Sequence, residues 1–374
     1  MFYSRKQGTW EPYKLEEMAN IIYTKLYMSY VESDQYQKEI KEQYAKRISS
    51  FSKEEVVRVV KSLGYSISCD EIHEAEIGNV NATYITEEYV IKVIKEKTRG
   101  YIANTLVSDS FPFDPVVRVL AHDMFNVTPY EVLIMKRSPG VVLQKDILEL
   151  DESTIKELFS QVIDVVVKCS TLTSETFGLV NSPDQRSASF RDLQKSKVDS
   201  YVQVILEAKL ADEKSIVRIQ NYFDTHAHVL ENEHAVLVHN DLHMGNILHS
   251  GNTLTAIIDW DSAYYAPLYT VLHTILGFID NPSQFVEGTV DYEKFKGVRF
   301  SYLIPILKER LPDIFKDENL ILKLNLFGIV EGLMWVSQNW STEWNREMIQ
   351  KLVEEETPDD IGLLKNSYYG RVLS

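Results

Sequence analysis

Three residues with side-chain oxygens, Asp241, Asn246 and Asp259, lie on one short stretch of the chain. The stretch reads AVLV at 235–238, HNDLHMGNIL at 239–248 and IIDWD at 257–261. Carboxylate and amide oxygens are hard ligands of the kind that bind Mg²⁺, and a carboxylate can orient a hydroxyl group and accept its proton. A cation facing the phosphates of a nucleotide would complete the protein's part in phosphoryl transfer. The three residues are therefore candidates for that chemistry.

The spacing of these residues makes the hypothesis more specific. Four residues separate Asp241 from Asn246, as in the catalytic loop of kinases. Asp259 follows at the distance where a metal-binding aspartate is expected. An aspartate and an asparagine at this interval are common by chance, but here they stand between apolar runs.

A β-hairpin is the element that would position them. Ser250, Gly251 and Asn252 separate two apolar runs, which predicts strands at 247–249 and 254–258 joined by a tight turn. Asn246 precedes the first strand and Asp259 ends the second. Antiparallel pairing would bring both to one end of the hairpin, beside the loop that carries Asp241.

The rest of the chain predicts an α+β fold with two lobes. Short β-like runs at 82–85, 89–94, 116–120 and 132–135 surround one short helix at 99–108. An amphipathic helix is expected from Ser52 to Gly64, and apolar residues at helical spacing predict further helices after Asp151 and near 320–336. We therefore predict a helical extension at 1–50, a small N-terminal lobe with an antiparallel sheet at 51–136 and a large, mainly helical C-terminal lobe at 137–374.

The two motifs resemble those of a known family. HNDLHMGNIL resembles the H-G/N-D-L-x-x-x-N-I/L loop of aminoglycoside phosphotransferases and choline kinases, and IIDWD resembles their I-I-D-W/F-E/D strand. The resemblance covers about residues 65–280 and implies a bilobal protein-kinase-like fold with ATP or GTP in the cleft. It implies that Asp241 is the catalytic base, that Asn246 and Asp259 bind Mg²⁺, and that His239 braces the loop.

The resemblance extends to the nucleotide site. VIKV at 90–93 resembles the strand whose lysine binds the α- and β-phosphates, so Lys92 is the candidate, although a solvent-facing strand lysine is the alternative. Gly78 and Asn79 lie where a loop covering the phosphates belongs. IMKRSPG at 134–140 resembles the hinge, where main-chain groups of three residues would meet the base: Met135, Lys136 and Arg137.

Two positions depart from the family pattern. The helix after the lysine strand usually has a glutamate that pairs with the lysine, but residues 99–110 contain none, and Asn104 stands near that place. Thr270 occupies the position of an aspartate that braces the catalytic loop in the family. The departures suggest a divergent branch whose acceptor cannot be taken from its relatives.

The acceptor site is expected in the helical lobe. Tryptophans 335, 340 and 344 cluster in sequence with glutamates 331 and 343, and aromatic faces with carboxylates suit an ammonium-bearing substrate. Helical spacing also fits an ordinary core. The acceptor candidates are Asp261, which could instead assist the metal site, Glu331 and Trp335.

Several functions remain open at this point. The acceptor could be an aminoglycoside-like antibiotic, or a metabolite such as choline, ethanolamine or a sugar. A kinase-like protein that binds nucleotide without catalysis is the third reading. A zinc hydrolase built on His239, His243 and His249 is a weaker one, because the spacing is not that of a helical zinc motif.

Composition limits the partners. A formal net charge of −16 argues against nucleic-acid binding and mildly favours a cationic acceptor. The chain has only two cysteines, Cys69 and Cys169, no apolar secretory core near its start, and no run approaching about eighteen uninterrupted apolar residues. We therefore expect a cytoplasmic protein that does not span a membrane; its oligomeric state stays open.

Overall fold

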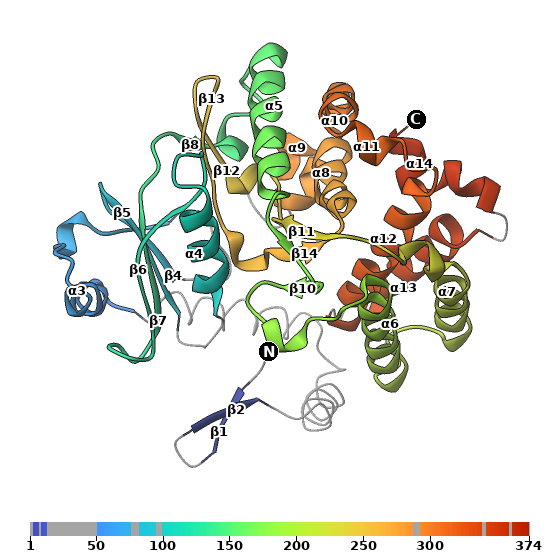
Figure 1. Cartoon of the computed structure of the whole chain (residues 1–374), viewed down its shortest axis with the longest axis horizontal. Coiled ribbons are helices and arrows are strands. Elements are labelled where there is room, and N and C mark those ends of the chain that lie inside the picture. The colour runs from blue at the N-terminus through green and yellow to red at the C-terminus, as the bar shows by residue number, and fades with distance from the viewer. Residues whose placement is uncertain are drawn as a thin grey trace.

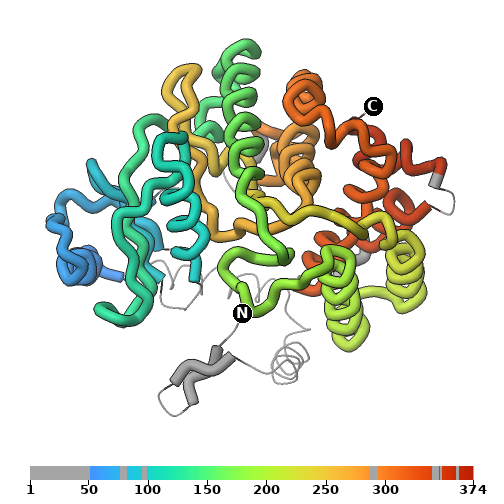
Figure 2. The backbone as a smooth tube through the Cα atoms, viewed as in Figure 1, coloured from blue at the N-terminus to red at the C-terminus, as the bar shows by residue number. Residues whose placement is uncertain are grey.

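The structure is a computed structural model that describes residues 3–6, 9–12, 51–75, 82–94, 99–286, 292–338, 342–358 and 361–373 (Figure 1). A lobe containing a sheet, drawn in blue to teal, lies beside a larger helical lobe in green to red (Figures 1 and 2). This arrangement confirms the predicted α+β bilobal fold.

The small lobe is built on a five-stranded antiparallel sheet with the order β3-β4-β5-β7-β6. Lys92 lies on β5, opposite Thr83 of β4 and Leu133 of β7. The strands are β3 (His73–Glu74), β4 (Ala82–Ile85), β5 (Tyr89–Ile94), β6 (Arg118–Met124) and β7 (Glu131–Lys136). The predicted strands are therefore present, although β6 runs further than the 116–120 expected from its apolar residues.

Helix α3 (Lys53–Ser62) covers one face of this sheet. Ser52 caps it by accepting a hydrogen bond from the Glu55 N–H over 3.1 Å, as expected of a serine at this position. Val56 and Val60 are buried against sheet residues in a separate small core. The predicted helix from Ser52 to Gly64 is thereby confirmed.

Helix α4 (Gly100–Ser110) belongs to the small lobe in sequence but packs with the large one. Ala103 and Val107 are fully buried in the same apolar cluster as the core of the helical lobe. Figure 1 shows α4 between the sheet and the C-terminal lobe. The position of α4 therefore depends on both lobes.

Two small sheets carry the centre of the large lobe. One has the order β13-β12-β8 and the other β10-β14-β11-β9. Their strands are β8 (Val141–Val142), β9 (Thr173–Ser174), β10 (Gly178–Leu179), β11 (Ala235–Val238), β12 (Ile247–Ser250), β13 (Thr253–Ile257) and β14 (Tyr264–Ala266). The hairpin β12–β13 with its turn at Gly251 confirms the prediction to within one residue at its strand ends.

Helices surround these sheets and supply most of the core. Asp151 caps α5 by accepting from the Thr154 N–H over 2.9 Å, as the sequence predicts. The helices are α5 (Glu152–Cys169), α6 (Phe190–Glu207), α7 (Glu213–His226), α8 (Val271–Asp280), α9 (Tyr292–Phe295), α10 (Ile304–Arg310), α11 (Pro312–Phe315), α12 (Leu320–Gln338), α13 (Thr342–Lys351) and α14 (Tyr368–Leu373). A π-helical turn at Leu352–Glu356 follows α13.

Helix α12 is long and apolar enough, by length and composition alone, to cross a membrane. However, 61% of its most apolar window is buried inside the molecule. Burial of this kind is that of a core helix, so α12 gives no reason to place the chain in a bilayer.

Where the chain enters the large lobe, directly before β8, the backbone of Gly140 lies very close to the backbone of His249. Gly140 has φ +97°, and a Cβ atom there would lie 2.0 Å from the main-chain oxygen of His249 on β12. Only glycine fits such a contact without moving the backbone. Gly140 thus fixes the hairpin against the segment that joins the lobes.

The predicted extension at 1–50 is described only in part. Its described residues form a two-stranded antiparallel hairpin, β1 (Tyr3–Lys6) and β2 (Thr9–Pro12), not a helix. The positions expected to be helical, from Leu15 to Leu26, lie outside the described residues.

Candidate active site

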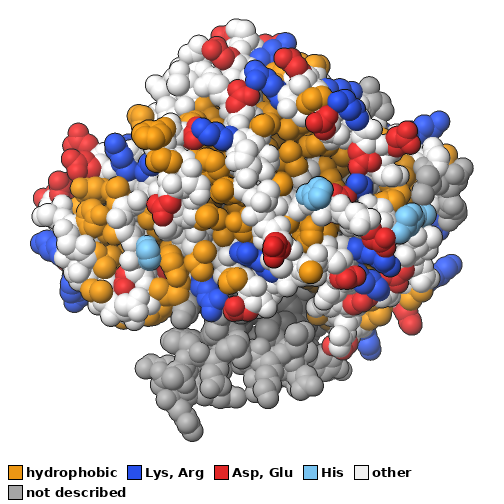
Figure 3. All heavy atoms as spheres, viewed as in Figure 1, with side chains coloured by type: hydrophobic (Ala, Val, Ile, Leu, Met, Phe, Trp, Pro, Cys, Tyr) orange, Lys and Arg blue, Asp and Glu red, His pale blue; other side chains and the backbone are white. Residues whose placement is uncertain are grey.

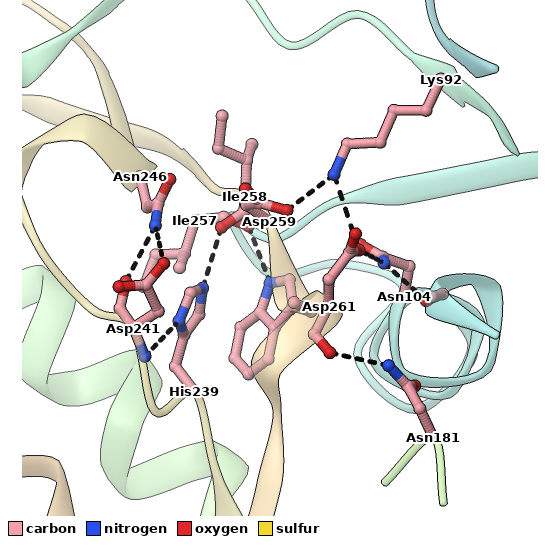
Figure 4. A network of polar contacts seen from close by, with 12 residues as sticks. Lys92, Asn104, Asn181, His239, Asp241, Asn246, Ile257, Ile258, Asp259 and Asp261 are labelled. Carbon is pink, nitrogen blue, oxygen red and sulfur yellow. Dashed lines mark hydrogen bonds and ion pairs between the residues drawn. The ribbon is translucent and has the colours of Figure 1, made fainter. Parts of the chain in front are cut away.

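The loop between β11 and β12 is held in place by His239. The buried His239 ring donates from Nε2 to the Ile258 oxygen over 2.8 Å, and its Nδ1 accepts the Asp241 N–H over 3.3 Å (Figure 4). Trp260 packs against the same ring at 4.5 Å between centroids and donates from Nε1 to the Ile257 oxygen. Burial lowers the pKa of His239, which keeps the ring neutral. The loop is thereby attached to strand β13.

Asp241 and Asn246 contact each other directly. The Asn246 amide nitrogen donates to the Asp241 main-chain oxygen over 2.8 Å and to its Oδ2 over 3.3 Å. The amide oxygen of Asn246 consequently points away from Asp241 (Figure 4). Asn240, just before Asp241, has a left-handed backbone with φ +63°, which asparagine tolerates better than most residues.

Asp241 has the proton affinity that a base needs near neutral pH. Burial, followed by the negative charge of Asp259, raises the pKa of Asp241 to about 7, and the hydrogen bond from Asn246 opposes this shift. A base with a pKa near the working pH combines the right protonation state with a useful driving force.

Asp259 and Lys92 join the two lobes across the site. The Lys92 Nζ lies 2.6 Å from Asp259 Oδ1, and Lys92 is only 8% exposed. Burial alone would lower the pKa of Lys92, but Asp259 and Asp261 together raise it, so the ammonium stays charged. The positive charge of Lys92 is in turn the main reason that the pKa of Asp259 is lowered. Asp259 also has a left-handed backbone, with φ +64°, the kind of strain found at functional sites.

Asp261 faces Lys92 and the beginning of α4. Its Oδ1 lies 3.5 Å from Lys92 Nζ and accepts from the Asn104 amide over 2.6 Å. The same amide donates to the Gly100 oxygen over 2.8 Å. A Cβ atom at Gly100 would lie 3.1 Å from the Asp261 carboxyl group. Asp261 was predicted at the acceptor or the metal, and that role stays a prediction; in the structure its carboxyl group lies beside Lys92 and the first turn of α4.

Asn181, which the sequence analysis did not select, completes this contact. Its side-chain oxygen accepts from the Ala103 N–H over 3.1 Å, and its amide donates to the Asp261 main-chain oxygen over 2.7 Å. Asn181 therefore bonds an amide in the first turn of α4 from the other lobe. Nothing in the local sequence indicates this role, because the partners are far apart in the chain.

The hinge residues Met135, Lys136 and Arg137 lie at the end of β7, which has strands on both sides up to Lys136. The Arg137 N–H already donates to the Glu88 oxygen over 2.8 Å, and its guanidinium donates to the Thr86 oxygen over 3.0 Å. The Arg137 N–H is thus paired with the turn between β4 and β5, and the contact of these three residues with a base stays a prediction. Gly78 and Asn79 lie outside the described residues.

Glu331 on α12 has a cation of the chain itself as its neighbour. Lys197 of α6 lies with its Nζ over the Tyr264 ring, 4.8 Å from the centroid. Burial raises the pKa of Glu331, and the nearby charge of Lys197 opposes this. Trp335 is 54% exposed one turn further along α12. Trp340 and the side chains of Glu343 and Trp344 lie outside the described residues.

The histidines of the zinc alternative have other partners. His243 stacks on Phe285 with ring centroids 4.7 Å apart, and the buried His249 contacts Asp146 Oδ1 over 2.8 Å. Within the described ranges, no group of three or more His, Cys, Asp or Glu side chains is placed to bind a metal ion. The structure therefore gives the zinc alternative no support there.

Thr270, at the position where the family pattern has an aspartate, bonds within its own turn. Its hydroxyl donates to the Pro267 oxygen over 2.8 Å. The loop contacts described above come from His239 and Trp260 instead.

Comparison with known protein families matches residues 102–294, more than half of the chain, to the phosphotransferase enzyme family (APH). The chain belongs to this family. The assignment made from the two motifs is thus confirmed, and with it an enzyme that transfers a phosphoryl group to a hydroxyl group of a small molecule. No curated protein matches the sequence.

Solved structures that resemble this chain in fold include aminoglycoside phosphotransferases. A thermostable form of APH(4)-Ia in ternary complex with AMP-PNP and hygromycin B is 17% identical with a TM-score of 0.56, covering 80% of this chain and 97% of that chain. APH(2″)-IIa in ternary complex with streptomycin and ATP is 15% identical with a TM-score of 0.56, covering 86% and 98%. ADP-bound APH(2″)-Ib is 14% identical with a TM-score of 0.56, covering 85% and 98%. At these identities the likeness concerns the fold.

Proposed function

We propose that the chain transfers the γ-phosphoryl group of ATP or GTP to a hydroxyl group of a small polar acceptor, with Asp241 as the base. The observation that carries the proposal is that two pairs lie side by side, Asn246 bonded to Asp241 over 2.8 and 3.3 Å and Lys92 of the small lobe bonded to Asp259 over 2.6 Å. His239 connects them, because it bonds both the Asp241 N–H and the oxygen of Ile258, next to Asp259. The relatives named above that hold a nucleotide support a nucleoside triphosphate as the donor.

The donor set at this site fits Mg²⁺. One carboxylate, Asp259, and one amide oxygen, Asn246, offer hard oxygen ligands, and Mg²⁺ usually takes its other ligands from water and substrate phosphates. The cation, when bound, would offset negative charge on the phosphates. The fit comes from the chemistry of the side chains and from the amide oxygen of Asn246, which points away from Asp241 (Figure 4).

The residues of the chain divide the remaining work. Asp241 would orient the acceptor hydroxyl and take its proton as the new bond from oxygen to the γ-phosphorus forms and the bond to the β-phosphate oxygen breaks. Lys92 would compensate charge on the departing nucleoside diphosphate. His239 keeps the Asp241 main chain in position through its bond to that N–H.

The acceptor can be an aminoglycoside-like compound, which the relatives with hygromycin B, streptomycin and gentamicin support. One observation favours the second candidate, a metabolite with fewer positive charges. Glu331, chosen from the sequence as a partner for an ammonium group, has a pKa that burial raises and that the positive charge of Lys197 opposes, so a cation of the chain itself already acts on it.

The chain is not expected to bind nucleic acid, and this stays a prediction. On the face in Figure 3, basic side chains are interspersed with acidic ones.

The test is nucleotide consumption with ATP and GTP across aminoglycosides, choline, ethanolamine and simple sugars. Asp241→Asn should lower turnover of any active acceptor by about 10²–10⁴-fold, the usual contribution of a general base. The control is Asp313→Asn, which removes the charge of an almost fully exposed aspartate on α11.

Each outcome decides between the candidates. Turnover of an aminoglycoside that disappears in Asp241→Asn supports the first acceptor class, and turnover of choline, ethanolamine or a sugar supports the second. Turnover close to wild type in Asp241→Asn would remove Asp241 from its role as base. Nucleotide binding without turnover of any acceptor would favour the non-catalytic reading.

A further inference from the structure

Helix α4 has no acidic residue in its first turn, yet Lys92 has a second carboxylate beside it. Residues 100–110 read GYIANTLVSDS, and the only acid, Asp109, lies near the far end of the helix. The carboxylate that reaches Lys92 alongside Asp259 belongs to Asp261, in the opposite lobe. We infer that Asp261 is a positioning residue for Lys92 and that Asn104 and Asn181 hold it in that role.

The two aspartates beside Lys92 differ in their surroundings. The Asp259 side chain is 43% exposed and ends strand β13, beside the loop that carries Asp241. The Asp261 side chain is 25% exposed and lies against α4. Asp259 is therefore the one that can turn to a metal ion, and Asp261 is the one that stays with the lysine. This step rests on the proposed function, because it takes Asp259 as the metal ligand.

Asn104 explains how the Asp261 carboxylate is oriented. Its amide is fully buried and divides its two donors between Asp261 Oδ1 and the Gly100 oxygen. A glutamate at 104 would place a second negative charge against Asp261. An uncharged donor is the type of side chain that this position needs once the carboxylate comes from the other lobe.

Asn181 fixes the main chain of Asp261. It donates to the Asp261 oxygen within the large lobe and accepts from Ala103 of α4. A movement of α4 away from the large lobe would break the bond from Ala103 and the bond from Asn104 to Asp261. The first turn of α4 also faces the Asp261 carboxylate with the positive end of the helix dipole. The position of Lys92 is in this way connected to the docking of α4.

The test compares three possible roles of Asp261 in one set of measurements. Calorimetry gives the affinity for AMP-PNP with and without Mg²⁺, and steady-state kinetics give the Mg²⁺ concentration for half-maximal turnover and the KM of the acceptor. Asp261→Asn keeps the shape and removes the charge. We expect it to weaken nucleotide affinity by about tenfold or more, with and without Mg²⁺, since a charge-assisted contact is lost. The Mg²⁺ requirement and the acceptor KM should stay within about twofold.

Moving the carboxylate from position 261 to position 104 tests whether Asp261 acts on Lys92 specifically or whether its loss only disturbs the fold. Asn104→Glu alone should weaken nucleotide affinity, because two carboxylates then compete in one place. The double variant Asn104→Glu with Asp261→Asn returns one carboxylate from the helix side and should bind AMP-PNP at least about fivefold more tightly than Asp261→Asn alone. Thermal melting of every variant checks that it is folded.

The outcomes separate this inference from the proposed function. Unchanged nucleotide affinity in a folded Asp261→Asn would overturn the inference and leave the proposed function standing. A shift in the Mg²⁺ requirement alone would make Asp261 a metal residue, and a shift in the acceptor KM alone would make it an acceptor residue; both contradict the inference. A double variant no better than Asp261→Asn would also contradict it. Failure of wild type to bind AMP-PNP in the presence of Mg²⁺ would overturn both.

Discussion

The two halves of the site are held together by different kinds of contact. In the catalytic loop and hairpin, the bonds join residues close in sequence, such as Asn246 to Asp241 at a separation of 5 and His239 to Ile258 at 19. Around α4 the bonds span the chain: Asn104 to Asp261 at 157 and Lys92 to Asp259 at 167. The hairpin can therefore form its geometry locally, whereas the lysine site exists only once both lobes have docked.

Because of this difference, we expect mutations in the two regions to change different measured properties. Changes in the hairpin should act on chemistry or on local folding, because the bonds that hold Asp241 and Asn246 join residues close in sequence. The main-chain bonds of Ile257 to Pro115 and Val117 are the exception, since they reach the small lobe. Changes around α4 should act on nucleotide affinity, because Lys92 and its partners sit between the lobes. Asp259 belongs to both regions.

Among the changes that test this comparison of the two regions, the largest effect should come from Asp259→Asn. The substitution keeps a residue that tolerates the left-handed backbone, φ +64°, but removes the charge that faces Lys92. We expect turnover to fall by about 10²–10³-fold, as when a group that stabilises transition-state charge is lost. The Mg²⁺ concentration for half-maximal turnover should rise as well. Steady-state kinetics over a Mg²⁺ series measures both.

Asp261→Asn is the control two residues away, because it removes the same charge beside the same lysine. Its Mg²⁺ requirement should remain that of wild type. If Asp259→Asn kept the wild-type Mg²⁺ dependence, the metal assignment would be wrong and Asp259 would only be a partner of Lys92.

The same division, between contacts close in sequence and contacts that join distant parts of the chain, explains which features could be predicted from the sequence. The hairpin, the helix caps at Ser52 and Asp151, and the place of Asp259 could be predicted because each depends on residues nearby in the chain. The role of Asn181 and the direction in which Asp261 points could not, because both depend on how α4 packs against the large lobe. The partner of the Arg137 N–H could not be predicted for a related reason, because Glu88 lies in the turn between β4 and β5.

The second largest effect is expected at Gly140, where the hairpin meets the segment joining the lobes. Gly140→Ala would place a Cβ atom 2.0 Å from the His249 oxygen at a φ of +97°. Because a backbone atom cannot move aside cheaply, we expect a loss of about 3 kcal/mol or more, seen as a fall in Tm of roughly 5 °C or more.

Gly251→Ala, in the turn of the hairpin that Gly140 contacts, is the control for Gly140→Ala. Gly251 also has a positive φ, +60°, but an added Cβ would meet nothing within 4 Å. Its cost should be only the backbone strain of about 1 kcal/mol. Equal melting temperatures for the two variants would show that the contact with the His249 oxygen costs much less stability than expected.

A third prediction concerns pH and a region remote from the site. His273 on α8 contacts the Tyr369 hydroxyl of α14, and burial lowers the pKa of His273 to about 4. Because the unfolded chain has a pKa near 6.5 for this group, the unfolded state binds more protons between these values. Stability should be fully present above about pH 6.5 and fall as the pH drops toward 4, by on the order of 2–3 kcal/mol.

His273→Gln removes this titration and keeps a hydrogen-bonding side chain toward Tyr369. The variant should therefore lose less Tm than wild type between pH 7 and pH 4.5, even if it starts lower. His228→Gln, at an exposed histidine, should follow the wild-type curve. A His273→Gln curve parallel to wild type would mean that other groups cause the acid sensitivity.

The smallest effect should come from Thr270→Val, which asks what braces the catalytic loop. The variant removes a buried hydroxyl that donates to the Pro267 oxygen, and that oxygen keeps its bond from the Thr270 N–H over 3.0 Å. The expected loss is about 1 kcal/mol of stability, the net value of one hydrogen bond, with turnover within about twofold of wild type.

Trp260→Phe gives the contrast, because it removes the bond to the Ile257 oxygen and changes the surface against His239. We expect lower turnover in this variant, since the His239 ring holds the Asp241 main chain. A Thr270→Val enzyme with strongly reduced turnover, beside a Trp260→Phe enzyme of normal activity, would reverse the assignment. It would show that the turn at Thr270 acts on the loop, and that it does so through packing and not through a hydrogen bond.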